Sequence, residues 1–233
     1  MPMVHIRSVA VATVALLLVA VGAVPAGAAT VATKMTKSYA AGYAAGASPV
    51  TSIDATVTLP SFTCASKSDL LSANVGSEDA DENVSFATVV LACSKKKVPF
   101  YGAQFDVDGT YSAASSVTLA AGDTVEMSIS CSAATGTSLT IDDVTSHTSA
   151  DASSSASSTC EAAFAGDEGL LKGKKVAPLP TFGAIDYSAV TMNGSPIGSF
   201  DTESTNYDGG KKAIITTGAL TAGGTAFTTT QGS

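Results

Sequence analysis

The feature that most constrains this chain is a series of short segments in which apolar and polar residues alternate, with turn residues between them. Residues 53–59 read IDATVTL and stop at Pro60, and residues 124–131 read TVEMSISC. Alternation with a period of two places one set of side chains on the buried face of a strand and the other in solvent. Helical periodicity is hard to find. The sequence therefore predicts an all-β protein, a two-sheet antiparallel β-sandwich.

Further segments of this kind complete the expected set of strands. Residues 84–93 (VSFATVVLAC) are apolar and β-branched throughout, which is typical of a strand buried on both faces. Residues 149–158 (SADASSSASS) are low-complexity polar sequence, and we expect a long surface loop or an insertion between strands there. The expected strands are 53–59, 84–93, 100–107, 116–119, 124–131, 138–145, 159–165, 184–190, 212–217 and 226–230.

The first 28 residues predict a secretory signal peptide. His5 and Arg7 precede an uncharged, largely apolar run over residues 8–24, and small residues follow up to Ala28. A membrane anchor is the alternative, but the run is shorter than the roughly 20 residues that a spanning helix needs. We expect cleavage between Ala28 and Ala29, a secreted protein, an N-terminal segment over 29–38 and a single β-sandwich domain over 39–233.

The charge balance argues against one class of partner. The chain has 12 basic and 20 acidic side chains, a net charge of −8 at pH 7. Nucleic-acid binding needs clustered Lys and Arg, and the clusters of three lysines at 95–97 and 172–175 are small. We expect no nucleic-acid partner. We also expect no membrane partner after signal removal, because no later apolar run could anchor the chain.

Four cysteines, Cys64, Cys93, Cys131 and Cys160, lie beyond the predicted signal peptide. An even number of cysteines in a secreted chain indicates disulfides, here two, for which three pairings exist. We favour Cys64–Cys93 and Cys131–Cys160, because the two spacings are equal and each pair brackets neighbouring expected strands. A zinc site is disfavoured, because close Cys-x-x-Cys pairs are absent.

The residues leave few routes to catalysis. Beyond the signal peptide His147 is the only histidine, and it lies in polar sequence typical of a surface position. A Ser-His-Asp site lacks a G-x-S-x-G segment, and a catalytic zinc site lacks further histidines. A calcium loop starting at Asp106 would have Val117 where a bidentate Glu belongs. We therefore expect no metal and no cofactor.

Carboxylate chemistry remains, and Glu161 is the candidate catalytic residue. It follows Cys160 and precedes an apolar run. A carboxyl group partly withdrawn from water has a raised pKa and can exchange protons as a general acid or base. The alternative is an exposed glutamate at the end of a strand.

Taken in order, several segments resemble the eqolisin family, the glutamic peptidases with a concanavalin A-like double β-sheet. The resemblance extends over residues 39–230 and implies that fold. The resembling segments are Ala41-Gly42-Tyr43, 53–60 (IDATVTLP), 101–107 (YGAQFDV), 117–129 (VTLAAGDTVEMSI), 138–145 (SLTIDDVT) and 179–185 (LPTFGAI).

In that family a Glu activates the attacking water and a Gln amide stabilises the tetrahedral oxyanion, which needs a preorganised donor. This chain departs from the pattern at both points. Its only glutamines are Gln104 and Gln231, and residues 86–93, where the resemblance places the catalytic Gln, contain none. The last Glu of the family's A-E-W-I-V-E segment falls near Phe164 or Ala165, so Glu161 fits only with a shifted register.

These observations favour a non-catalytic protein that binds an unidentified extracellular protein or peptide. The first alternative is a diverged acid endopeptidase that uses Glu161, with another donor in place of the Gln. The second alternative is a structural protein of the cell surface.

Overall fold

The structure is a computed structural model that describes residues 39–81, 83–155, 159–172, 175–208 and 214–232. The predicted signal peptide, its cleavage site between Ala28 and Ala29 and the segment 29–38 lie outside the described residues. No helix in the described ranges is long and apolar enough to cross a membrane.

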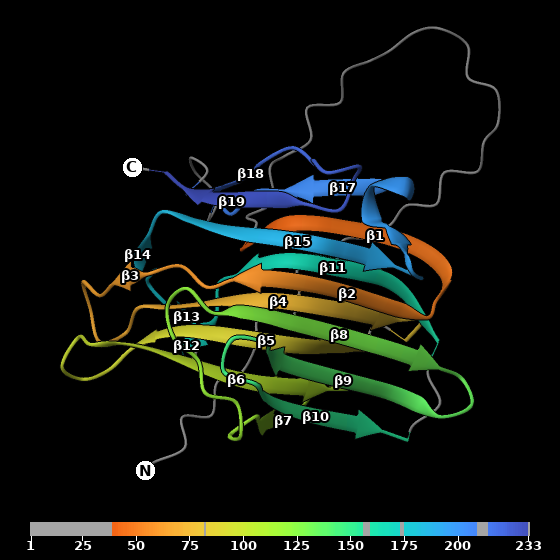
Figure 1. The fold of residues 1–233 in the computed structure, drawn as a ribbon, viewed down its shortest axis with the longest axis horizontal. Coiled ribbons are helices and arrows are strands. Elements are labelled where there is room, and N and C mark those ends of the chain that lie inside the picture. Colours follow the sequence, from red (N-terminus) through yellow and green to blue (C-terminus); the bar gives the residue numbers. More distant parts are fainter. Residues whose placement is uncertain (1–38, 82, 156–158, 173–174, 209–213, 233) are drawn as a thin grey trace, which may run out of the picture.

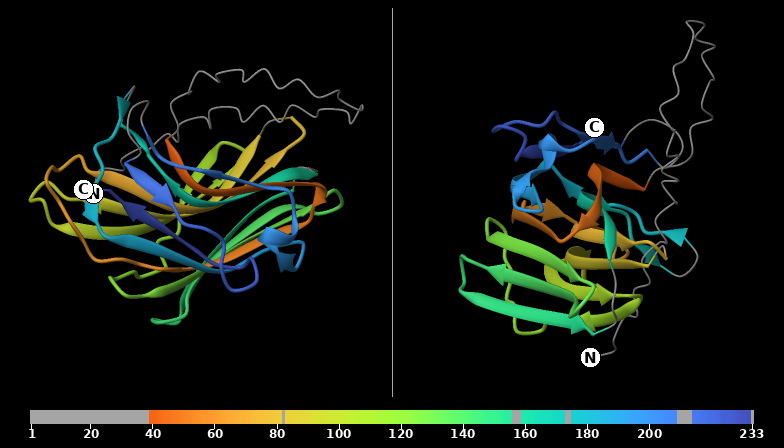
Figure 2. Two further views of the ribbon diagram at one scale, coloured as in Figure 1. Left: turned by 90° about the horizontal axis from the view of Figure 1, so that it is seen from above. Right: turned by 90° about the vertical axis from the view of Figure 1, so that its right-hand side faces the viewer.

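Two antiparallel sheets face each other and form a sandwich (Figures 1 and 2). The first sheet has the spatial order β17 (Thr202–Thr205), β1 (Ala40–Val50), β11 (Cys160–Glu168), β4 (Leu70–Asp79), β5 (Val84–Cys93), β6 (Pro99–Val107) and β7 (Thr110–Ala113). The second has the order β10 (Thr148–Ser154), β9 (Gly136–Asp143), β8 (Thr124–Ser132), β2 (Ser52–Thr58), β15 (Ala184–Met192), β19 (Phe227–Gln231) and β18 (Ile215–Thr217), and β16 (Ser195–Pro196) also pairs with β15.

Shorter elements complete the fold. β3 (Phe62–Thr63) pairs with β14 (Thr181–Phe182), and β12 (Leu171–Lys172) pairs with β13 (Lys175–Val176). A single 3₁₀ turn, η1 (Ile197–Ser199), follows β16. The predicted all-β sandwich is therefore confirmed.

The core lies between the sheets and is built from the alternating residues of both. Strand β8 turns Val125, Met127 and Ile129 inward, and all three are buried while Glu126 between them is exposed. Strands β4 and β5 differ, because nearly all of their residues are buried. This confirms the expectation for 84–93 and means that something also covers the outer face of the first sheet.

Part of that cover is a small apolar cluster on the outer face. Leu170 and Ala177 come from the segment that follows β11, and they pack against Leu70, Val90 and Ala92 of β4 and β5. The described side chains around this cluster therefore lie in a low-dielectric environment, although they are outside the main core.

The strand prediction was wrong in several places. Residues 149–154 form the edge strand β10 and not a loop, because alternation along SADASS lets it pair with β9. Residues 116–119 are not a strand. Strands β1 and β4 were missed, since β1 is rich in Ala and Gly and β4 carries polar residues at buried positions.

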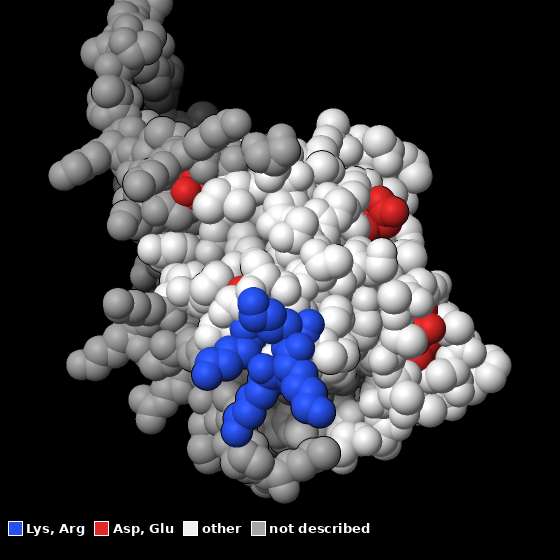
Figure 3. Space-filling view, turned by 90° about the vertical axis from the view of Figure 1, so that its left-hand side faces the viewer, with Lys and Arg blue, Asp and Glu red and all other residues white. Residues whose placement is uncertain are grey.

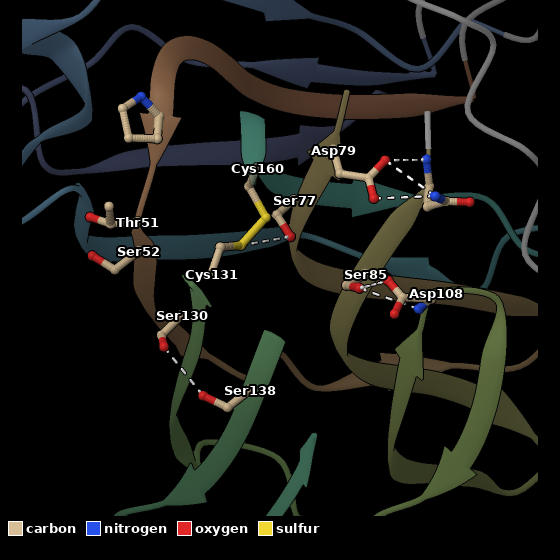
Figure 4. Close-up of a disulfide and its surroundings, with 12 residues drawn as sticks. Thr51, Ser52, Ser77, Asp79, Ser85, Asp108, Ser130, Cys131, Ser138 and Cys160 are labelled. Atoms are coloured by element: carbon tan, nitrogen blue, oxygen red, sulfur yellow. Dashed lines mark hydrogen bonds between the residues drawn. A yellow bond between two sulfur atoms is a disulfide. The ribbon is translucent and has the colours of Figure 1, made fainter. Parts of the chain in front are cut away.

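Both predicted disulfides are confirmed, Cys64–Cys93 and Cys131–Cys160. The second joins β8 of one sheet to β11 of the other, and the hydroxyl of Ser77 on β4 lies 3.8 Å from the Cys131 sulfur (Figure 4). From the entropy of closing each loop, each bridge stabilises the folded chain by about 3–4 kcal/mol.

Candidate functional site

The polar residues of β4 and their neighbours define a candidate site on the outer face of the first sheet. Directly paired residues of adjacent strands share a face, as do alternate residues along one strand. Glu168 pairs with Ser72, Asn74 pairs with Thr88, and Phe86 pairs with Asp106. The odd-numbered neighbours Ala73, Val75 and Ala165 belong to the core. We call Ser72, Asn74, Thr88, Asp106 and Glu168 the outer-face cluster.

A close approach of β1 and β11 positions the end of β11 beside this cluster. Gly42 of β1 pairs with Gly166 of β11. A Cβ on either glycine would lie 2.2 Å from a backbone carbonyl oxygen of the facing strand, a distance that real Cβ atoms do not adopt. Only glycine permits this spacing, which holds the end of β11 and Glu168 against the neighbouring strands.

Hydrogen bonds join Glu168 to a carboxamide. Asn74 Nδ2 donates to Glu168 Oε2 over 3.2 Å and to Ser72 Oγ over 3.0 Å, and Ser72 Oγ donates to the Glu168 backbone carbonyl over 3.0 Å. Ser72, Asn74 and Glu168 are 0%, 2% and 6% exposed. Asn74 Oδ1 has no hydrogen-bond partner among the described residues. The arrangement therefore holds a buried acid beside an amide whose oxygen is still available.

Burial changes the proton affinity of Glu168. It raises the pKa of this carboxyl group from 4.5 to about 8, and the charge of Asp106 adds to the increase. A carboxyl group withdrawn from water favours its neutral form. Glu168 therefore keeps its proton through the acidic and neutral pH range, which makes it a proton donor.

Asp106 is the second acid of the cluster and is 3% exposed. Burial raises its pKa, the side chain of Tyr111 and the backbone of Gly109 lower it by hydrogen bonding, and the charge of Asp108 raises it. Asp106 Oδ1 has no partner among the described residues. Two acids in unlike environments on one face are the arrangement that separates general acid and base roles.

The predicted site residue Glu161 lies elsewhere on β11. It is exposed, at the irregularity in strand pairing between Cys160 and Ala162. Its assignment as the catalytic acid stays a prediction. Of the two glutamines, Gln104 pairs with Thr88 on the outer face. Gln231 lies elsewhere, where its Oε1 accepts a hydrogen bond from the Phe182 N–H and its Nε2 donates to the Pro180 carbonyl.

The other residues considered from the sequence lie in turns. His147 is exposed with a φ of 57° between β9 and β10, and Asp108 lies in the turn between β6 and β7 with a φ of 50°. Among the described residues, no group of three or more His, Cys, Asp or Glu side chains is arranged to hold a metal ion.

Sequence reasoning missed Glu168 and Asn74. Strand β4 was not predicted, because its polar residues interrupt the apolar pattern of a strand. In addition, β11 continues to Glu168, beyond the predicted end at residue 165. The available signal was the acidic pair Asp167-Glu168 directly after an apolar run, together with Ser72 and Asn74 at alternate positions.

The comparisons with known proteins agree with this fold. The sequence profile described as the peptidase A4 family matches residues 38–230. A crystal structure of scytalido-glutamic peptidase with a peptide-based transition state analog is 16% identical with a TM-score of 0.70, covering 83% of this chain and 98% of that one.

Two further structures are similar. SCP-B, an eqolisin solved with the tripeptide Ala-Ile-His, is 17% identical with a TM-score of 0.68, covering 83% of this chain and 98% of that one. Aspergilloglutamic peptidase from Aspergillus niger is 18% identical with a TM-score of 0.58, covering 70% of this chain and 99% of that one. No curated protein sequence matches the chain.

Proposed function

Because the chain belongs to the peptidase A4 family, we propose that it hydrolyses peptide bonds in an acidic extracellular environment, with Glu168 as the catalytic acid and Asn74 as its carboxamide partner. The observation that supports this most is the 3.2 Å hydrogen bond from Asn74 Nδ2 to Glu168 Oε2 on the outer face of the sheet. The family resemblance calls for a Glu and an amide, and this pair supplies both from β11 and β4.

The chemistry follows from the protonation state of Glu168. A pKa of about 8 leaves the carboxyl group neutral at acidic pH, so its first step is to donate a proton to the leaving amide nitrogen. A water molecule adds to the carbonyl carbon, the C–N bond breaks, and the carboxylate formed on Glu168 takes a proton from that water. Glu168 ends the cycle protonated, and the products are a carboxylic acid and an amine.

Asn74 has a separate role in this proposal. Its two amide N–H groups donate to Glu168 and Ser72, so it holds the carboxyl group in place. An oxyanion could accept from Asn74 Nδ2 only after one of these hydrogen bonds opens, and in that role Asn74 would take the place of the family's Gln, which is absent from β5.

The experiment is a digestion of denatured protein substrate at acidic pH by the chain from Ala29 onward. We expect cleavage by the wild type, its loss in Glu168→Gln, and its persistence in Glu161→Gln, a matched change of an exposed Glu on the same strand. Loss in Glu161→Gln alone would instead assign catalysis to Glu161.

A non-catalytic binding protein is the second candidate, favoured by the absence of Gln from residues 84–93. It predicts no cleavage by any variant while peptides still bind the outer-face cluster. Titration calorimetry with peptides, comparing wild type with Glu168→Gln and Asn74→Ala, distinguishes this outcome from inactivity of a misfolded sample.

A further inference from the structure

The hairpin between β5 and β6 projects from one end of the sandwich and carries a patch that the proposed function does not use (Figure 1). Lys95, Lys96 and Lys97 are exposed, and the apolar side chains that follow them, Val98 and Phe100, are 56% and 49% exposed. These two are the most exposed large hydrophobic residues among those described. Lys67, from the loop before β4, is also exposed.

Covalent and hydrogen bonds fix these two loops beside each other. The Cys64–Cys93 disulfide joins the loop of Lys67 to the end of β5, and Cys93 N–H donates to the Asp69 carbonyl over 3.2 Å. The hairpin tip is itself closed by Ser94, whose backbone N–H donates to the Val98 carbonyl over 3.0 Å. The four lysines therefore form one preorganised surface, which we call the lysine tip.

The lysine tip contrasts with the charge of the rest of the molecule. The chain has a net charge of −8, yet Lys67 and residues 95–97 are the cationic side chains that the structure describes, and they gather at one end (Figure 3). Within the described ranges none of them forms an ion pair with an acidic group. An anionic surface would therefore attract this end and repel the others.

We propose that the lysine tip binds the surface of a bilayer that contains anionic lipids, with Val98 and Phe100 entering the interface and the lysines contacting headgroup phosphates. Interfacial binding combines buried apolar area with attraction of basic residues to anionic headgroups. The tip combines exposed apolar side chains with exposed lysines, which is the combination that binding at a membrane interface uses. The sequence-based expectation of no membrane partner concerned an anchor that crosses the bilayer, and a peripheral contact needs none.

The test is cosedimentation of the chain from Ala29 onward with vesicles, and circular dichroism of each variant checks the fold. At about physiological salt, we expect binding to vesicles of phosphatidylcholine that contain about 30% phosphatidylglycerol. We expect no binding to vesicles of pure phosphatidylcholine. Changing Lys95 and Lys96 to Gln and Lys97 to Asn should weaken binding about 100-fold, at about fivefold for each lysine. Asn is chosen at position 97 because its φ is 57°.

Matched controls distinguish a specific role of the lysine tip from a general effect of net charge or of exposed apolar area. Three exposed serines on β10, β15 and β17, changed as Ser153→Asp, Ser188→Asp and Ser204→Asp, lower the net charge equally and should retain most of the binding. Phe100→Ser should weaken binding severalfold, and Ile214→Ser, another exposed apolar position, should not.

Three results would overturn the proposal. They are no binding to anionic vesicles, equal binding to both vesicle types, and equal losses in the lysine variant and the serine control. Binding of an acidic protein in the absence of any affinity for vesicles would assign the surface to a protein partner instead. None of these outcomes depends on peptide cleavage.

Discussion

Asp167 and Glu168 are adjacent on β11 and point to opposite faces of the first sheet. Asp167 faces the core, where Tyr187 OH donates to it over 2.7 Å and Thr229 Oγ1 also donates. Glu168 faces outward beside Asn74. Burial raises the pKa of Asp167 to about 7 and that of Glu168 to about 8.

The difference between the two acids lies in their hydrogen bonds. Both oxygens of Asp167 accept bonds from strands of the second sheet, β15 and β19, so this residue joins the two layers. In the cluster around Glu168, Asn74 Oδ1 and Asp106 Oδ1 are buried without partners in the described part of the chain. Satisfied groups indicate a structural role, whereas buried unsatisfied groups need a further partner, such as an ordered water or a group of a ligand.

The largest predicted effect is a difference in peptide hydrolysis between variants of the two acids. Glu168→Gln should lower kcat/KM for a peptide substrate by a factor of about 10²–10⁴, the usual contribution of general acid–base catalysis. Asp167→Asn should leave kcat/KM within a few-fold of wild type at a pH where the variant is folded. Steady-state kinetics of both variants checks this, and equal losses in the two would erase the distinction.

The second prediction concerns stability against pH. Folding raises the pKa of Asp167 from 3.8 to about 7 and that of Glu168 from 4.5 to about 8. The two protonated acids therefore contribute fully to the free energy of unfolding below about pH 4. This contribution is lost as the pH rises through the pKa values of the folded state, and for Asp167 the loss is about 4 kcal/mol. Urea unfolding between pH 4 and 8 measures this. Asp167→Asn should flatten the decline, and a wild-type stability that increases over this range would refute the assignment.

A smaller effect tests the inner hydrogen bonds alone. Tyr187→Phe removes a donor to the buried Asp167, and it should lower the free energy of unfolding by about 1–3 kcal/mol. Activity should fall far less than in Glu168→Gln, because the hydroxyl faces the core and touches the site only through the backbone of Asn74. The measurement is urea unfolding at pH 4 together with the peptide assay, and a loss of activity without a loss of stability would contradict the structural role.

The smallest predicted effect is on the outer face. Ser72→Ala removes a bond to the Glu168 backbone and an acceptor for Asn74, so the free energy of unfolding should fall by about 1 kcal/mol. Because Asn74 loses one of its two anchors, kcat should fall severalfold while KM changes little. Kinetics that match wild type in a destabilised variant would show that Asn74 needs no positioning by Ser72.

Much of the fold could be predicted from local pattern, and the site could not. Strand β5 has the bounds expected from its apolar β-branched run, and both disulfides match the pairing favoured from equal spacing and the bracketed strands. Strand β4 was missed because Ser72 and Asn74 break its apolar pattern, and these are the residues that form the site. Asn74 and Glu168 are 94 residues apart, so only the pairing of β4 with β11 brings them together.

The most direct test of the central claim is the dependence of kcat/KM on pH for the wild type and Glu168→Gln, measured where both are folded. If protonated Glu168 is the proton donor, wild-type kcat/KM should hold through acidic pH and fall as the pH approaches about 8, while Glu168→Gln stays at least about 100-fold lower throughout. A folded Glu168→Gln enzyme with wild-type kcat/KM would contradict the account.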